Sequence, residues 1–168
     1  TDPHGWIVDR ITAVRETPRR HRRSKTVPSV AELESEGLIA PDDDPHRYFD
    51  QRERSIAEWL AANGVHGLRS VRRRHGHRRR TPDGIFDRGN SCATIEMKAP
   101  SAATADGVRR NTRVGTEQSR IVVLDFRGSG LDLATGIDGV RRVVRQNGND
   151  LDQLIVMLKG NSRLGWKP

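Results

Sequence analysis

The stretch TPDGIFDRGNSCATIEMKAP, residues 81–100, contains two runs with apolar side chains that are each introduced by turn-forming residues. A Pro-Asp-Gly turn at 82–84 precedes the first run, and a second turn near Gly89 leads into residues 92–98. Runs of this kind around glycine-containing turns are typical of a β-hairpin. The sequence therefore predicts two adjacent antiparallel strands, of which residues 92–98 are the second.

The second predicted strand carries charged side chains on one face. Side chains two residues apart on a strand project to the same side, so Glu96 and Lys98 point together while Ile95 and Met97 face the opposite layer. Half-buried charges are costly unless they are paired or bound to a metal. This face is the candidate catalytic surface, although a Glu-x-Lys pattern also occurs on a simple solvated strand face.

Asp83, in the turn before the first strand, adds a second carboxylate to this surface. Mg²⁺, or another divalent cation such as Mn²⁺, prefers oxygen ligands and keeps several waters, so Asp83 and Glu96 are the predicted metal ligands. A bound metal lowers the pKa of a water and offsets negative charge at phosphorus. Lys98 is expected to orient the attacking water or to neutralise the phosphate. Taken alone, the Pro-Asp-Gly sequence is a common structural turn.

A helix is predicted upstream of the hairpin. Ile56 and Leu60 recur at helical spacing before an Asn-Gly stop at 63–64, which predicts an amphipathic helix over residues 49–62. Glu53 lies on this helix. We expect its carboxylate to hold a metal-associated water from the side.

The remaining apolar runs alternate between strand and helix patterns. Strands are predicted over residues 65–71, 121–126 and 154–158, and helices over residues 102–118 and around 137–144. The run at 121–126 is rich in branched residues, which is the mark of a central strand covered on both faces. The predicted fold class is α/β, with a mixed β-sheet flanked by helices.

Residues 1–47 lack sustained periodicity and are predicted to form a polar leader of uncertain structure, whereas residues 48–168 form the folded domain. Within the leader, a short helix is expected at 30–38 with Ser29 as its cap. Because the chain begins at Thr1 rather than methionine, we expect it to be a fragment of a longer polypeptide; the alternative is that removal of a tag produced the same start.

The 168-residue chain has a formal net charge of +8, which favours polyanionic partners and nucleic acid first. A run of arginines before Asp83 is the candidate for phosphate contact, which positions a substrate without reading its sequence. These arginines are Arg72, Arg73, Arg74, Arg78, Arg79 and Arg80. The alternative for this run is a solvated cluster of charges.

Two further properties of the composition restrict the partners. Aromatic residues make up 4% of the chain, too few for the stacking platforms of single-strand binders, so a folded, helical RNA is the more natural substrate. No apolar stretch approaches the roughly 20 residues that span a bilayer. No membrane partner is therefore expected for the folded domain.

The order of these motifs resembles the PD-(D/E)xK nuclease superfamily, whose signature corresponds here to Pro82-Asp83 and Glu96-Met97-Lys98. More specifically, the chain resembles the tRNA nuclease toxin domains of contact-dependent growth inhibition systems, over about residues 49–158. In those domains a Pro-Asp turn is followed by Glu-x-Lys, an Ala/Thr-containing helix start, a glutamine and a strand ending in Asp. The corresponding stretches are Thr81-Pro82-Asp83-Gly84, Ile95-Glu96-Met97-Lys98-Ala99-Pro100, Ala103-Thr104-Ala105, Gln118 and Val122-Val123-Leu124-Asp125.

The resemblance implies that Asp83, Glu96 and Lys98 are catalytic, with Glu53 and Gln118 as supporting residues. Gln118 is plausible on physical grounds because the end of its predicted helix lies beside the strand that follows. Its alternative role is that of an ordinary polar residue at a helix end.

Four other polar residues invite a functional interpretation. Thr104 and Asn111 are candidate hydrogen-bond donors to phosphate, although residues of these types near helix starts are usually caps. His75 and His77 lie among arginines, which disfavours cation binding and favours RNA contact or simple exposure.

The resemblance also implies a restriction-endonuclease-like fold and a metal-dependent endonuclease, with tRNA as the substrate. Such a domain is a toxin of interbacterial competition that is secreted or delivered from the cell surface within a larger protein and acts in the target-cell cytoplasm. Charge and resemblance together predict an acidic immunity protein. Three alternatives stay open: a DNA endonuclease of the same fold, a non-catalytic basic nucleic-acid-binding module, and a metal-free RNase that uses His75 or His77 as acid and base.

Overall fold

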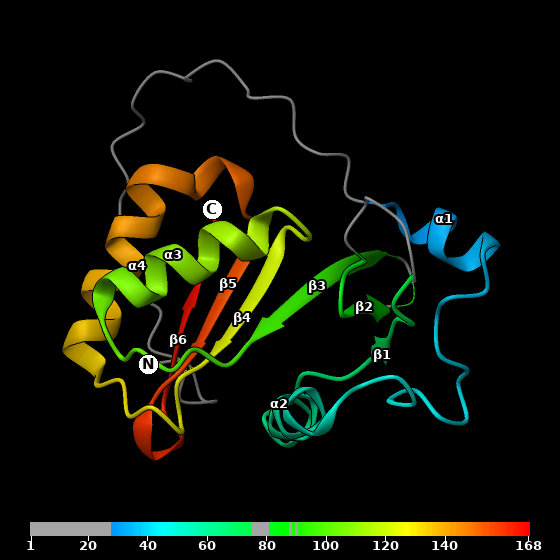
Figure 1. Ribbon diagram of the computed structural model, residues 1–168, viewed down its shortest axis with the longest axis horizontal. Helices are drawn as coiled ribbons and strands as arrows, with labels where there is room; N and C mark the ends of the chain where they lie inside the picture. The colour runs from blue at the N-terminus through cyan, green and yellow to red at the C-terminus, as the bar shows by residue number, and fades with distance from the viewer. Residues whose placement is uncertain (1–27, 75–80, 88, 90) are drawn as a thin grey trace.

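The computed structural model describes residues 28–74, 81–87, 89 and 91–168 (Figure 1). Its elements in chain order are α1 (Val30–Ser35), α2 (Gln51–Ala62), β1 (Leu68–Ser70), β2 (Gly84–Asp87), β3 (Cys92–Lys98), α3 (Ala105–Thr116), β4 (Ile121–Asp125), α4 (Leu133–Asn147), β5 (Gln153–Met157) and β6 (Arg163–Trp166). Two short 3₁₀ turns, Gly148–Asp150 and Lys159–Asn161, flank β5.

The strands form one mixed sheet in the order β1-β2-β3-β4-β5-β6. The predicted hairpin is confirmed, since β2 and β3 pair antiparallel with Gly84 opposite Ile95. β3, β4 and β5 run parallel to one another, and β6 returns antiparallel to β5. The sheet therefore changes from antiparallel to parallel pairing at β3, the strand that carries Glu96 and Lys98.

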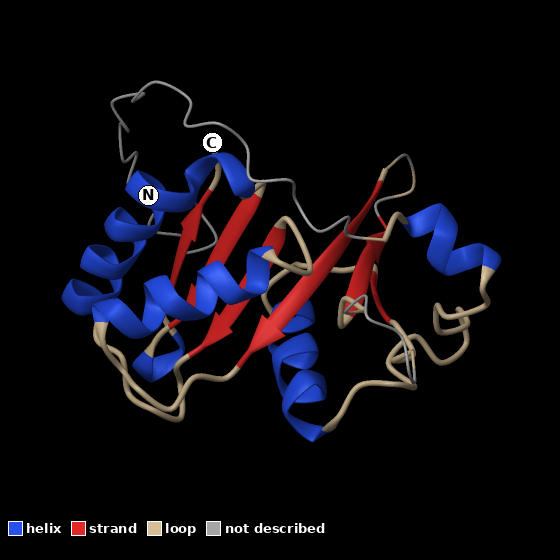
Figure 2. Ribbon diagram, turned by 45° about the horizontal axis from the view of Figure 1, so that its top comes forward, coloured by secondary structure: helices blue, strands red, loops and turns tan. Residues whose placement is uncertain are grey.

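Helices cover both faces of the sheet, with α3 and α4 on one side and α2 on the other (Figure 2). Alternate residues of β4 enter the two layers: Val122 and Leu124 pack in the α3–α4 core, while Ile121 and Val123 pack in the α2 core. All four side chains are buried. This two-sided burial confirms the prediction of a central strand and explains why its sequence is an unbroken apolar run.

Side chains at the helix starts explain where the helices begin. Ser29 and Asp50 form capping boxes with the glutamate three residues later, and Asp132 caps α4. The helix predicted over 102–118 is shorter, because Thr104 caps it and Ala105 is its first residue. Ala61 and Ala62 complete α2, in agreement with the predicted stop at Asn63-Gly64.

One predicted helix and one predicted strand extend beyond the observed elements, and in each case a glycine with positive φ lies close to the observed end. The helix expected over 30–38 ends at Ser35, since Gly37 has a φ of 63° and Leu38 turns back to donate to the Leu33 carbonyl. The strand expected over 65–71 begins only at Leu68, after Gly67 with a φ of 82°. β6 was not predicted.

The described part of the predicted leader packs against the sheet. Leu33 and Leu38 share a small apolar cluster with Val71 and Ile85, and Ile39 forms an isolated bridge with Val71. Residues 28–47 therefore contribute to the packing at the β1–β2 end. Within the described ranges, no helix combines the length and apolar character that a bilayer crossing requires.

Candidate active site

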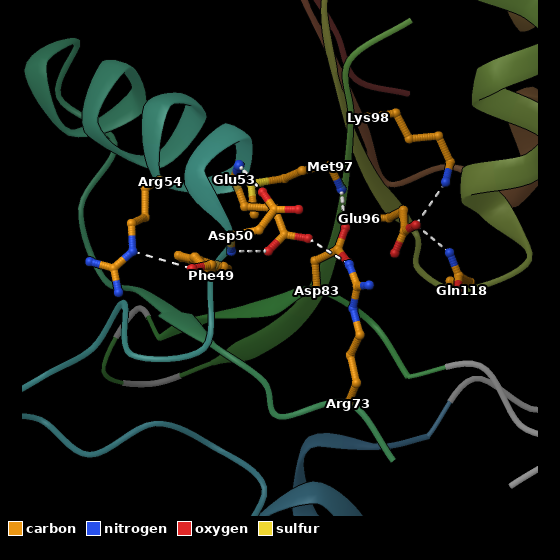
Figure 3. A network of polar contacts seen from close by, with 10 residues as sticks. All are labelled: Phe49, Asp50, Glu53, Arg54, Arg73, Asp83, Glu96, Met97, Lys98 and Gln118. Atoms are coloured by element: carbon orange, nitrogen blue, oxygen red, sulfur yellow. Dashed lines mark hydrogen bonds and ion pairs between the residues drawn. The ribbon is translucent and has the colours of Figure 1, made fainter. Parts of the chain in front are cut away.

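The three predicted catalytic residues and Glu53 come from three separate segments and line one pocket (Figure 3). Glu53 comes from the first turn of α2, Asp83 from the bend before β2, and Glu96 and Lys98 from β3. The pocket has a volume of ≈ 210 Å³. Its charged lining residues are Asp50, Arg52, Glu53, Arg73, Asp83, Glu96 and Lys98. The tertiary structure thus brings together the three predicted catalytic residues and Glu53.

Glu53 is held by the capping box that starts α2. Its Oε2 accepts a hydrogen bond of 2.8 Å from the Asp50 N–H, and its own N–H donates to Asp50 Oδ1 at 2.9 Å. Its other oxygen, Oε1, accepts a hydrogen bond of 3.0 Å from the Arg73 guanidinium. Glu53 therefore has a structural role at the helix start and also presents one oxygen to the pocket.

Asp83 is fixed through both its backbone and its side chain. The Val71 N–H donates to the Asp83 carbonyl at 2.9 Å, and the Met97 N–H donates to Asp83 Oδ2 at 2.8 Å. Asp83 Oδ1 lies 3.9 Å from the Arg73 guanidinium. The side chain of Asp83 therefore anchors to β3, the strand that carries the partner carboxylate.

Glu96 is almost completely buried, with 3% of its surface exposed. Its Oε1 accepts a hydrogen bond of 2.8 Å from Lys98 Nζ and another from Gln118 Nε2. Its Oε2 is buried and has no hydrogen-bond partner among the described residues. Gln118 reaches this position because Gly115 lets the end of α3 approach Val122 closely.

The three carboxylates share one arrangement: the scaffold holds one oxygen of each, and the other either contacts the exposed Arg73 side chain or, in Glu96, has no hydrogen-bond partner among the described residues. The held oxygens are Glu53 Oε2, Asp83 Oδ2 and Glu96 Oε1. The other oxygens are Glu53 Oε1, Asp83 Oδ1 and Glu96 Oε2. Such anchoring fixes the orientation of a carboxylate without using both of its oxygens.

The electrostatics of the pocket disfavour its negative charges. Burial, followed by repulsion from Glu96, raises the pKa of Asp83 to about 7. Burial also raises the pKa of Glu53, although the Asp50 N–H opposes this shift, and it raises the pKa of Glu96 against the attraction of Lys98. A pocket that raises three carboxyl pKa values is one in which a bound cation would be stabilised.

The residues present fit a magnesium site with few protein ligands. Within the described residues, no group of three or more His, Cys, Asp or Glu side chains could hold a metal ion as they stand. Magnesium needs no such group, since it is usually bound through one or two carboxylates together with waters and substrate phosphates. Asp83 and Glu96 would supply those two carboxylates, and Glu96 Oε2, which has no partner among the described residues, is a polar atom for which a cation would provide one.

The other residues predicted to bind nucleic acid differ in accessibility. Arg72 and Arg73 are exposed, whereas Arg74 is largely buried and forms an ion pair with Glu36. Thr104 is exposed and accepts a hydrogen bond of 2.9 Å from the Gly107 N–H, so it acts as the cap that its sequence position suggested. Asn111 donates to the Gly107 carbonyl. The remaining predictions, Arg78, Arg79, Arg80, His75 and His77, lie outside the described residues.

One capping residue of the pocket, Asp50, and one contact of Arg73 were not predicted from the sequence. Asp50 was missed, although the Asp-x-x-Glu spacing before an apolar helix is a recognisable capping-box pattern. Arg73 was predicted to contact phosphate, but its contact with Glu53 joins positions 20 residues apart and has no local signal. Both contribute to how the carboxylates are held.

Comparison of the chain with family models, with curated proteins and with solved structures gives no match. The geometry of the carboxylate pocket and the charge of the chain are therefore the observations from which a function can be proposed.

Proposed function

We propose that this chain is a metal-dependent endonuclease that hydrolyses phosphodiester bonds, with tRNA as its preferred substrate. One observation carries the proposal: Asp83, Glu96 and Lys98 line a single pocket, and each of the two carboxylates keeps one oxygen free of the scaffold. The α/β mixed sheet with helices on both faces is compatible with a restriction-endonuclease-like fold, which is part of the same proposal.

The proposed roles follow from the positions of the side chains. Asp83 and Glu96 would hold Mg²⁺ or Mn²⁺, which supplies a Lewis acid that makes a nearby water more acidic and offsets charge at phosphorus. Lys98 lies 2.8 Å from Glu96 Oε1, where its ammonium group can orient the attacking water or neutralise the phosphate. Gln118 keeps Glu96 in place, and Glu53 presents Oε1 to the same pocket.

The biological setting belongs to the same proposal. A small basic nuclease is harmful to the cell that makes it, so we expect an acidic immunity protein to cover the pocket or its basic edge. The net charge of +8 favours such a partner as well as nucleic acid. Delivery within a larger protein, from the surface of one bacterium to the cytoplasm of another, is the proposed route.

A cleavage assay tests the proposal directly. The purified chain is incubated with total tRNA and, in parallel, with supercoiled plasmid, in the presence of Mg²⁺ or of EDTA. We expect Mg²⁺-dependent cleavage of tRNA, and we expect Glu96→Gln and Lys98→Ala to lower its rate by at least about 100-fold.

Matched control variants are Glu58→Gln and Lys159→Ala, which change exposed residues of the same charge outside the pocket. They are expected to cleave at the wild-type rate. Cleavage of plasmid in place of tRNA would assign the site to a DNA endonuclease. Binding of nucleic acid without cleavage under every condition would leave the non-catalytic basic module.

A further inference from the structure

Arg73 contacts the pocket in a way that substrate binding alone does not explain. Its guanidinium lies 3.0 Å from Glu53 Oε1 and 3.9 Å from Asp83 Oδ1, so it points inward at two carboxylates rather than outward toward a phosphate (Figure 3). We propose that Arg73 is a built-in counter-cation, which neutralises Glu53 and Asp83 when no divalent metal is bound and is displaced when the metal binds. This inference rests on the proposed metal site.

The contact involves the oxygens that a metal would require. Glu53 Oε2 and Asp83 Oδ2 are held by the backbone N–H groups of Asp50 and Met97, and no backbone group of the described residues holds Glu53 Oε1 or Asp83 Oδ1. Arg73 approaches both of these oxygens. Full coordination of a divalent cation by Asp83 Oδ1, or capture of its water by Glu53 Oε1, therefore competes directly with Arg73.

The exposure of the three side chains makes such a displacement feasible. The Arg73 side chain is 71% exposed, whereas those of Glu53 and Asp83 are 11% and 9% exposed. The backbone next to Arg73 is anchored, because the Val71 N–H donates to the Asp83 carbonyl and the Arg72 N–H donates to the Leu38 carbonyl. A long exposed side chain on a fixed backbone can leave the pocket by rotation of its own bonds.

The balance of charge in the pocket favours displacement of Arg73 by the metal. Among the described residues, Glu53, Asp83 and Glu96 are three carboxylates contacted by two cationic side chains, Arg73 and Lys98. An ion pair whose arginine is largely exposed is weakened, because solvent screens the guanidinium. A divalent cation adds twice the charge of a guanidinium and also reaches the carboxylates more closely. The metal is thus the stronger competitor, and Arg73 lowers its apparent affinity.

Isothermal titration calorimetry of the full chain with Mn²⁺ and with Mg²⁺, in the absence of nucleic acid, tests this inference. We expect Arg73→Gln to bind either metal about two- to fivefold more tightly than the wild type, which corresponds to the loss of one partly exposed ion pair. Arg73→Lys keeps the positive charge and is expected to bind metal with nearly wild-type affinity.

The matched control is Arg142→Gln on α4, which removes the same charge from an exposed arginine that is also paired, to Asp138 at 2.8 Å. Its metal affinity is expected to equal that of the wild type. Equal or weaker binding by Arg73→Gln would overturn the role of Arg73 while leaving the metal site intact. If none of the proteins binds either metal, the proposed metal site is wrong, and so is the role of Arg73 as its counter-cation.

Discussion

At the scale of single residues, the pocket combines fixed geometry with unfavourable charge. Each carboxylate is held through one oxygen, and burial raises the pKa of all three groups. Folding therefore places ionised carboxylates where water no longer stabilises them. Such sites lower the stability of the isolated protein, and a bound ligand that supplies positive charge restores that stability.

Asp83→Asn is expected to stabilise the metal-free protein at neutral pH. The pKa of Asp83 is raised from 3.8 to about 7 in the folded chain. Its carboxyl group therefore does not lower the free energy of unfolding below pH 4, where it is protonated in both states. It lowers this free energy increasingly between pH 4 and 7, and by a constant amount above pH 7. Asparagine keeps the acceptor for the Met97 N–H without the charge. We expect a gain of about 1–3 kcal/mol at pH 8 that disappears near pH 4.

Urea denaturation in EDTA between pH 4 and 8 measures this effect. The control variant is Asp152→Asn, which removes an exposed carboxylate paired with Arg120, and its effect is expected to stay within about 1 kcal/mol at every pH. A constant difference between Asp83→Asn and the wild type across this range would contradict the raised pKa.

At the scale of elements, the site depends on close helix packing made possible by glycine. A Cβ built at Gly115 would lie 2.8 Å from a Val122 methyl group, and one at Gly139 would lie 2.6 Å from Val108 Cβ. The first contact sets α3 on β4, and the second sets α4 on α3. Because Gln118 comes just after Glu117, the C-cap of α3, the position of that helix determines whether Gln118 reaches Glu96.

Gly139→Ala is expected to destabilise the fold by about 1–2 kcal/mol. The overpacking of α4 against Val108 costs about 1–3 kcal/mol, which exceeds the gain in helix propensity of up to about 1 kcal/mol. Thermal unfolding followed by circular dichroism measures the change. Gly128→Ala is the control, since a Cβ there meets nothing within 4 Å and its φ lies outside the left-handed range, and an equal effect of the two substitutions would contradict the packing argument.

At the scale of the whole molecule, the net charge governs which partners are attracted, and the pocket is the proposed site of reaction. The net charge of +8 attracts any polyanion, whether it is tRNA, DNA or an acidic protein. Charge alone therefore does not separate the proposed nuclease from a basic binding module. The carboxylates of the pocket favour the proposed nuclease, since a binding module gains nothing from buried acids beside its phosphate contacts.

Binding of tRNA by the Glu96→Gln variant is expected to weaken by at least about tenfold between about 50 and about 200 mM salt. Lysine and arginine contacts with phosphate release counterions, and added salt opposes that release. Fluorescence anisotropy with labelled tRNA measures the affinity at each concentration. Sucrose of matched osmolality is the control, because it does not screen charges, and a flat salt response would contradict a phosphate-driven interaction.

The sequence by itself determined the local features of this protein. Turn chemistry and alternating side chains predicted the hairpin of β2 and β3, and the branched apolar run predicted the central position of β4. The same patterns placed Glu96 and Lys98 on one face of β3, since the direction of neighbouring side chains follows from the strand itself. The α/β fold class and the charged face of β3 could be predicted because both depend on patterns among residues that are close in the chain.

Only the tertiary structure decided which atoms meet. Gln118 reaches Glu96 across 22 positions, and Arg73 reaches Glu53 across 20, through contacts that no local period encodes. The short edge strand β6 and the packing of residues 28–47 likewise depend on partners far away in sequence. Which oxygen of each carboxylate is held and which is free was therefore set by packing, because hydrogen bonds between distant segments form only after the sheet and its helices have assembled.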